Sequence, residues 1–178
     1  PDIDIVYLCI PNVLHADAAL RCLRAGKHVL CEKPLAPTPK QTVELFEAAK
    51  EKGVFLMEAY AYLHSPFVTA LKKEIEEGTI GEIRYIESQF LTSYYDKSNI
   101  RLHKENYGGA VYDLGCYNTS MLLKLLEDMP SRVKAMAQYD ENGVDIYTAA
   151  LLNYENDVRA SITCGMIFEK DKPHRYDR

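Results

Sequence analysis

The sequence predicts an α/β fold in which a parallel sheet is followed by an α+β domain with a largely antiparallel, open sheet. Two observations lead to this prediction. Short apolar runs alternate with amphipathic stretches up to about residue 60, and strand-like runs joined by tight turns occupy residues 132–166. Alternating strands and helices are typical of parallel sheets, whereas consecutive strands are typical of antiparallel ones. We therefore expect two domains, residues 1–62 and residues 63–178.

Three strands and two helices are expected in the first domain. The apolar run at residues 3–10 is nearly continuous, as in a strand buried on both faces, and shorter runs follow at residues 28–31 and 54–57. Between these runs, apolar residues recur at the spacing of an amphipathic helix. The expected buried helix positions are Ala16, Ala19, Leu20 and Leu23, and then Leu45, Phe46 and Ala49.

Capping residues mark the ends of these two helices. Thr38 can cap the second helix, with Pro39 at the first helical position and Gln41 three residues after the cap. Gly26 and Gly53 are expected to end the two helices, because glycine adopts the left-handed conformation of a helix C-terminus at little cost.

The second domain is expected to begin with a helix and to continue mostly as strands. Ser65-Pro66 begins this helix, which ends at Gly78. A strand at residues 82–90, a polar loop and a helix at about residues 110–126 follow. The residues expected to be buried in the first of these helices are Phe67, Ala70, Leu71 and Ile75. Further strands are expected near residues 132–139, 144–154 and 158–166, with hairpin turns at Asn142-Gly143 and Asn156-Asp157.

The composition argues against several classes of function. The net charge of −5 gives no basic patch for a nucleic acid, and no apolar run approaches the ~20 residues of a membrane span. The start of the chain lacks the features of a signal peptide. Five scattered cysteines without a Cys-x-x-Cys pair argue against a disulfide framework and favour a reducing, cytoplasmic location. No histidines have metal-ligand spacing, so no metal is expected.

Polar residues follow each of the three expected parallel strands. These segments are Pro11-Asn12, Glu32-Lys33-Pro34 and Glu58-Ala59-Tyr60. Because the carboxyl ends of parallel strands meet at one edge of the sheet, where open α/β sheets bind ligands, the three segments predict a binding site. For any single strand end, ordinary solvation is the better explanation, and only the three together favour a site. Glu58 alone is consistent with a structural charge.

Lys33, Asp113 and Tyr117 are the candidates for chemistry. Pro34 restricts Lys33 to an extended backbone, so its ammonium group is held in place. Asp113 and Tyr117 lie four residues apart in an expected helix and share one face. An ammonium group beside a tyrosine favours the phenolate, which suits proton exchange with an alcohol or carbonyl. A surface lysine and a packed core tyrosine remain the alternatives, and His15 is consistent with either a buried structural or a functional histidine.

Three ordered motifs resemble those of the glucose–fructose oxidoreductase / inositol dehydrogenase / MocA family. They are Cys9-Ile10-Pro11-Asn12-Val13-Leu14-His15, Gly26-Lys27-His28-Val29-Leu30-Cys31-Glu32-Lys33-Pro34 and Gly108-Gly109-Ala110-Val111-Tyr112-Asp113-Leu114-Gly115-Cys116-Tyr117. The resemblance implies part of a Rossmann-type dinucleotide-binding domain, followed by a domain whose open sheet packs against a partner subunit. Tyrosine rather than histidine at position 117 resembles the branch that contains glucose–fructose oxidoreductase, dihydrodiol dehydrogenases and aldose dehydrogenases.

The resemblance also implies a role for each motif residue. Residues in contact with NAD or NADP would be Ile10, Pro11, Asn12, His15, Glu32, Lys33, Pro34 and Arg101. Residues in contact with the substrate would be Lys33, Tyr60, Asp113 and Tyr117. In this branch Tyr117 would be the general acid/base, Lys33 its electrostatic helper, and Asp113 the residue that orients the substrate.

Both ends of the chain are expected to continue in the intact protein. A strand that begins at the third residue implies sheet before it, and the family's Gly-x-Gly-x-x-Gly loop should precede Pro1. The rest of the second sheet should follow Arg178, after the polar segment of residues 169–178.

The predicted function is hydride transfer between a nicotinamide cofactor and a hydroxyl or carbonyl group of a sugar, polyol or diol, in a homodimer or homotetramer. Two alternatives remain open. One is a non-catalytic dinucleotide-binding or regulatory protein of the same fold, and the other is a fragment that serves in oligomerisation. The joint presence of Lys33, Asp113 and Tyr117 favours the enzyme.

Overall fold

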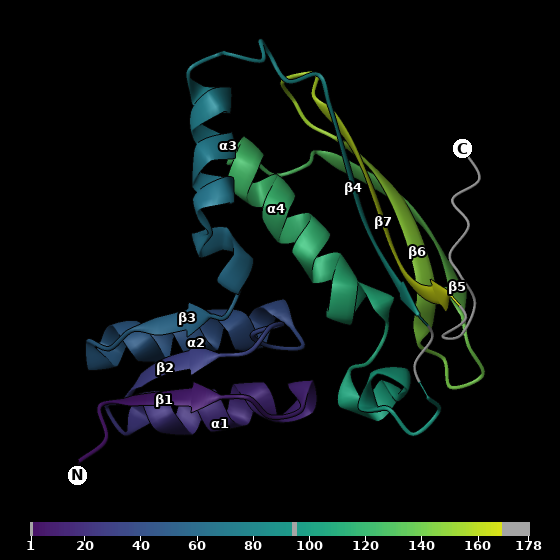
Figure 1. The fold of residues 1–178 in the computed structure, drawn as a ribbon. Helices are drawn as coiled ribbons and strands as arrows, with labels where there is room; N and C mark the ends of the chain where they lie inside the picture. The colour runs from purple at the N-terminus through teal and green to yellow at the C-terminus, as the bar shows by residue number, and fades with distance from the viewer. Residues whose placement is uncertain (1, 94–95, 169–178) are drawn as a thin grey trace. The chain divides into compact units, whose positions relative to one another are not determined.

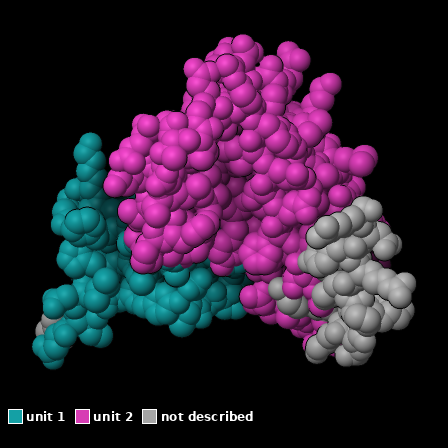
Figure 2. All heavy atoms as spheres, turned by 45° about the horizontal axis from the view of Figure 1, so that its top comes forward, with its two compact units in different colours: residues 1–61, 105–107 teal, residues 62–104, 108–178 magenta. Residues whose placement is uncertain are grey.

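The computed structural model describes residues 2–93 and 96–168, so the predicted polar segment of residues 169–178 lies outside the described residues. The chain divides into two compact units, which Figure 2 shows in different colours. The N-terminal unit comprises residues 1–61 and 105–107, and the C-terminal unit comprises residues 62–104 and 108–178. Each unit is described separately below.

The N-terminal unit is a three-stranded parallel sheet with two helices (Figure 1). Its elements are β1 (Ile5–Leu8), α1 (Asn12–Arg24), β2 (His28–Cys31), α2 (Pro39–Lys52) and β3 (Leu56–Glu58). The strands follow the order β1-β2-β3, and both pairings are parallel. The parallel sheet predicted for the first part of the chain is therefore confirmed, with shorter first and third strands than expected.

Both helices pack on the same face of this sheet. The shared core contains Leu23 of α1 and Leu45 of α2 against Val29 and Cys31 of β2. Alternate residues of a strand point to opposite faces, so neighbouring side chains face away from the helices. Ile5 is 60% exposed as a result. The prediction that the first strand is buried on both faces is therefore wrong for the described residues.

The predicted helix boundaries of this unit are confirmed. The Thr38 side chain accepts a hydrogen bond from the backbone N–H of Gln41, and Pro39 occupies the first turn. Gly53 ends α2 in the left-handed conformation, with φ of 64°. One predicted core position is wrong, because Phe46 is 51% exposed and Ala48 takes its place in the buried stripe. Helical spacing permits a buried stripe with either Phe46 or Ala48, and packing against α1 selects the one with Ala48.

The C-terminal unit combines a four-stranded mixed sheet with two main helices (Figure 1). Its main elements are α3 (Pro66–Glu76), β4 (Tyr85–Ser93), α4 (Cys116–Leu126), β5 (Arg132–Tyr139), β6 (Asp145–Asn153) and β7 (Arg159–Phe168). Short 3-10 turns lie at Ala61–His64, Ile100–Leu102 and Lys104–Asn106, of which the first and the last include residues of the N-terminal unit. The strand order is β4-β7-β6-β5, in which only the β4–β7 pairing is parallel among the described strands.

Two tight hairpins join β5, β6 and β7, as the sequence predicts. Gly143 has a φ of 74° in the first hairpin and Asp157 a φ of 63° in the second. These left-handed conformations suit glycine and, less readily, aspartate. The largely antiparallel character of this sheet is therefore confirmed.

Helix α4 covers one face of this sheet, while α3 is only partly buried. Leu122 of α4 packs on Ala150, Ala160 and Ile162 of the sheet. Ser65 caps α3 through the backbone N–H of Val68, as expected, but Val68 is the buried residue of this helix. The predicted burial of Phe67 and Ala70 is wrong: Phe67 is 70% exposed and Ala70 is also exposed, because α3 turns a different side inward. None of the described helices has the length and apolar character needed to span a membrane.

Candidate functional site

The polar segments after β1, β2 and β3 lie level at one edge of the N-terminal sheet. The register pairs Leu8 with Cys31 and Cys31 with Glu58, so the three strands end beside one another. The three segments that follow the strand ends are therefore brought together, as the sequence predicts from the parallel topology.

Lys33 is half-buried in the turn after β2, and its peptide bond to Pro34 is cis. The preceding carboxylate, Glu32, accepts a hydrogen bond from the hydroxyl group of Tyr7. This bond raises the pKa of Tyr7 to about 12, because ionisation would place two negative charges together. Tyr7 thus contacts the predicted site although the sequence analysis did not select it.

His15 is completely buried beneath this edge. Its Nδ1 lies 2.8 Å from the carbonyl oxygen of Pro34, and its Nε2 lies 2.7 Å from the carbonyl oxygen of Ile10. The ring therefore links the segment after β1 to the turn after β2. Both of its nitrogens face the main chain rather than the surface.

Glu58, at the end of β3, is half-buried and joins the same turn. Its Oε1 accepts a hydrogen bond of 2.7 Å from the backbone N–H of Leu35. Burial raises the pKa of Glu58, while hydrogen bonds from Leu35 and Tyr60 and the positive charges of His15 and Lys33 oppose this shift. The strand-end pattern pointed to Glu58, but sequence reasoning gave it no functional role.

Asn12 begins α1 and binds a segment that is distant in the sequence. Its Nδ2 donates to the carbonyl oxygen of Tyr107 at 3.3 Å. Tyr107 has a positive φ of 52° and belongs to the short stretch of residues 105–107 that packs with the N-terminal unit. No pattern in the sequence predicts this contact.

In the C-terminal unit, Arg101 and Asp113 form an ion pair. The Nε of Arg101 donates to Oδ1 of Asp113 at 2.8 Å, and the aspartate side chain is 10% exposed. Asp113 lies in a π-helical turn, Val111–Gly115, that leads into α4. Such turns recur at functional sites. The sequence analysis selected both residues but did not foresee that they pair, nor that the predicted helix begins with a π-helical turn.

Just before this turn, two glycines let the backbone pass close to Arg101 and Asp145. A side chain on Gly108 would place its Cβ 2.3 Å from the carbonyl oxygen of Arg101. At Gly109, where φ is 114°, a Cβ would lie 2.2 Å from Oδ1 of Asp145. The other carboxylate oxygen of Asp145 accepts from the backbone N–H of Val111 at 2.9 Å. Asp145, on β6, therefore holds the start of the helix that carries Asp113 and Tyr117.

Tyr117 is half-buried between two aromatic rings. The ring centroids of Tyr62 and Phe90 lie 5.6 and 5.4 Å from that of Tyr117. The Tyr62 hydroxyl donates to the carbonyl oxygen of Tyr117 at 3.2 Å and lies 2.7 Å from Oγ of Ser120. Burial raises the pKa of Tyr62. Neither Tyr62 nor Phe90 was selected from the sequence, because aromatic contacts between a turn, a strand and a helix leave no periodic signal.

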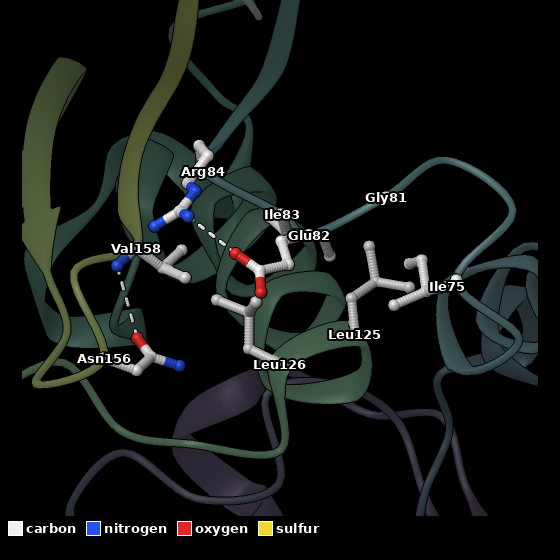
Figure 3. A pocket seen from close by; sticks show the side chains of 10 residues that line it. Ile75, Gly81, Glu82, Ile83, Arg84, Leu125, Leu126, Asn156 and Val158 are labelled. Carbon is white, nitrogen blue, oxygen red and sulfur yellow. Dashed lines mark hydrogen bonds and ion pairs between the residues drawn. The ribbon is translucent and has the colours of Figure 1, made fainter.

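A further hollow of about 690 Å³ lies in the C-terminal unit at the ends of α3 and α4 (Figure 3). Apolar residues line it together with an exposed ion pair between Arg84 and Glu82, and the Asn156 side chain accepts from the backbone N–H of Val158. None of the predicted site residues lines it. Its composition gives no set of convergent polar groups, so we place no functional site there.

Comparison with known proteins assigns both units to one group of enzymes. Residues 1–60 match the family described as "Oxidoreductase family, NAD-binding Rossmann fold", and residues 68–177 match "GFO/IDH/MocA C-terminal domain". The fold and these matches define an oxidoreductase architecture with a dinucleotide-binding domain. The chain belongs to the GFO/IDH/MocA oxidoreductase family, as the motifs predict.

Individual relatives are similar over nearly the whole chain. Trans-1,2-dihydrobenzene-1,2-diol dehydrogenase of Xenopus laevis is 35% identical over 92% of this chain and 49% of its own length. The structure of a 3-ketoreductase from Actinomadura kijaniata, in complex with NADP and TDP-benzene, matches with a TM-score of 0.86 and 36% identity over 94% of this chain and 52% of its own.

A third similar structure is that of aldose-aldose oxidoreductase from Caulobacter crescentus, complexed with glycerol. It matches with a TM-score of 0.89 and 28% identity over 95% of this chain and 52% of its own. The chain thus spans about half the length of the relatives that it matches.

Proposed function

We propose that the protein containing this chain transfers hydride between NAD or NADP and a hydroxyl or carbonyl group of a sugar, polyol or diol. Membership of the family supports this proposal, and relatives with this architecture include a diol dehydrogenase and a sugar-nucleotide reductase. In this chain the main support is the cluster of polar side chains at the edge where the three strands of the N-terminal sheet end. The Arg101–Asp113 ion pair and the packing of Tyr117 against Phe90 add to it.

The edge of the N-terminal sheet fits a nicotinamide cofactor. Asn12, Glu32 and Lys33 offer half-buried donors and acceptors directly after parallel strands, where dinucleotides bind in this class of sheet. The residues proposed to hold it are Ile10, Pro11, Asn12, Glu32, Lys33, Pro34 and Arg101, with His15 supporting two of these segments from beneath. When bound, the cofactor supplies the carbon that accepts or donates the hydride.

The protein's own residues handle the proton. Tyr117 takes the hydroxyl proton of the substrate in oxidation and returns it in reduction. The positive charge of Lys33 favours the phenolate form that accepts this proton. Asp113, held by Arg101, accepts hydrogen bonds from substrate hydroxyls, and Tyr60 lines the substrate side of the sheet edge. This division of roles makes Tyr117 the acid/base and Lys33 its electrostatic partner.

Replacing Tyr117 by phenylalanine tests this assignment in the full-length protein. The variant keeps the ring between Tyr62 and Phe90 but removes the hydroxyl group, so kcat should fall roughly 10²–10⁴-fold while cofactor binding persists. Tyr139→Phe, at a 65% exposed position on β5, is the matched control and should keep full activity. Full turnover by Tyr117→Phe would contradict the proposal.

The two alternative functions give different results in the same assays. A regulatory dinucleotide-binding protein would bind NAD or NADP tightly yet oxidise no member of a broad panel of sugars, polyols and diols. An oligomerisation module would form a stable assembly without binding either cofactor. The enzyme should show cofactor binding and turnover together.

We further propose that the protein forms a homodimer or homotetramer through the open face of the C-terminal sheet, in a cytoplasmic setting. On the face away from α4, Met136 is 74% exposed and Leu151 is 61% exposed. Their burial by a second copy would remove apolar surface from water. Five scattered cysteines without a Cys-x-x-Cys pair support a reducing compartment. Leu151→Lys should lower the mass measured by light scattering, whereas Met129→Lys, in the turn after α4, should not.

A further inference from the structure

One peptide unit in the Lys33 turn is held by side chains on both of its sides. Nδ1 of His15 lies 2.8 Å from the carbonyl oxygen of Pro34, and Oε1 of Glu58 lies 2.7 Å from the backbone nitrogen of Leu35. The Pro34 carbonyl and the Leu35 N–H are the two polar groups of a single peptide bond. That peptide, one residue beyond Lys33, is therefore fixed between a histidine and a carboxylate.

The histidine side of this clamp bridges two carbonyl groups. Both neighbours of the His15 ring, the oxygens of Ile10 and Pro34, are carbonyls and can only accept hydrogen bonds. The ring is therefore fixed between two segments of main chain. It is completely buried, so water does not compete for these contacts.

The carboxylate side is anchored by groups from two segments. Glu58 ends β3, Tyr60 donates to it from the same segment, and Leu35 donates from the Lys33 turn. The charged groups that act on Glu58 are His15 from α1 and Lys33 from the turn, both positive. The neighbouring Cys31 stays an uncharged thiol, because burial raises its pKa to about 12.

We infer that His15 and Glu58 are positioning residues that set the place of Lys33 by clamping the Pro34–Leu35 peptide. The inference rests on the proposed function, since Lys33 acts there on the proton of Tyr117. Neither residue needs to touch substrate for this role. When His15 or Glu58 no longer holds the Pro34–Leu35 peptide, the Lys33 turn can relax. The ammonium group of Lys33 then moves away from the position in which it favours the phenolate form of Tyr117.

Kinetics of the full-length protein separate this role from a merely structural one. Glu58→Ala leaves the Leu35 N–H without its acceptor, so kcat should fall on the order of 10²-fold, as for a small misplacement of a catalytic group. The acid/base pKa in its kcat profile should shift in the same direction as in Lys33→Met. Glu58→Gln keeps an oxygen acceptor at this position and should restore both. Val54→Ala, which weakens the same core, should lose stability without a shift of the profile.

Nitrogen NMR of the histidines tests the clamp independently of turnover. The ring nitrogens of buried His15 should give resonances distinct from those of exposed His64, and Glu58→Ala should shift the His15 resonances but not those of His64. If no hydride transfer occurs, the proposed function fails, and the clamp is then tested by NADH affinity, which Glu58→Ala should weaken more than Val54→Ala. His15 resonances that stay unchanged in Glu58→Ala, or a Glu58→Ala variant that behaves like Val54→Ala, would overturn the inference.

Discussion

In the N-terminal unit the candidate site follows from strand ends, whereas in the C-terminal unit it is assembled from a loop, a π-helical turn and two strands. Parallel pairing alone brings the residues after β1, β2 and β3 to one edge. In the C-terminal unit, Arg101 pairs with Asp113 where Gly108 and Gly109 pass close to Arg101 and Asp145, and Asp145 holds the start of the helix. The first site depends on topology, and the second depends on a few specific long-range contacts.

Substitutions at the point where Gly108 passes the backbone of Arg101 should therefore have the largest effects. Gly108→Ala would place a Cβ 2.3 Å from the backbone oxygen of Arg101, so it should cost roughly 3 kcal/mol or more of unfolding free energy. Gly143→Ala, at a position where φ is 74° but no atom lies within 4 Å of the added Cβ, should cost only about 1 kcal/mol. Urea denaturation measures both, and equal losses would show that the passage is not tight.

The Arg101–Asp113 pair is the next contact to break. Arg101→Met leaves a buried carboxylate without its cation, which should cost about 1–3 kcal/mol of stability. Arg159→Met removes an exposed pair with Asp157 and should cost less than about 0.5 kcal/mol. Thermal unfolding compares the two variants. An Arg101→Met protein as stable as Arg159→Met would mean that Asp113 does not depend on this contact.

The N-terminal caps of α2 and α3 should contribute equally to the unfolding free energy in the two units. Thr38 caps α2 and Ser65 caps α3 through the same kind of hydrogen bond. Replacing either by alanine should cost about 1 kcal/mol, and neither variant should change kcat. A much larger loss at one cap, measured by denaturation, would show that the units differ in local stability as well as in how their sites are built.

One buried thiol in each unit should respond identically to pH. Burial raises the pKa of both Cys31 and Cys164 to about 12. The thiols ionise near pH 9 in the unfolded chain but near 12 in the folded one, so their contribution to stability is complete below about pH 9 and is lost between pH 9 and 12. At pH 8, iodoacetamide should modify exposed Cys9 but neither buried thiol. Modification of Cys31 alone would indicate opening of the N-terminal unit.

Much of the fold could be predicted because its signals are local. Thr38, Gly53 and Ser65 act within one helical turn, and Gly143 acts within one hairpin. The prediction failed at Phe46 and Phe67, where helical spacing allowed neighbouring stripes and tertiary packing selected another one. Helical periodicity alone does not decide which side of a helix is buried, because that depends on the element that packs against it.

The candidate site shows the same limit more clearly. Strand ends placed Lys33 and Tyr60 at one edge by topology, and the family motifs pointed to Asp113 and Tyr117. The contacts of Tyr62 with Tyr117 and of Arg101 with Asp113 join residues 55 and 12 positions apart, in turns without periodicity. Such pairings depend on the folded chain and were not foreseen.

The central proposal is that Lys33 of one unit and Tyr117 of the other serve the same proton transfer. The most direct test is the pH profile of kcat for the full-length protein and its Lys33→Met variant, with Lys40→Met on α2 as the control. Loss of the ammonium group should move the pH profile of kcat to higher pH, because the phenolate is no longer favoured, while the control keeps the wild-type profile. A Lys33→Met profile identical to that of the wild type would contradict the proposal.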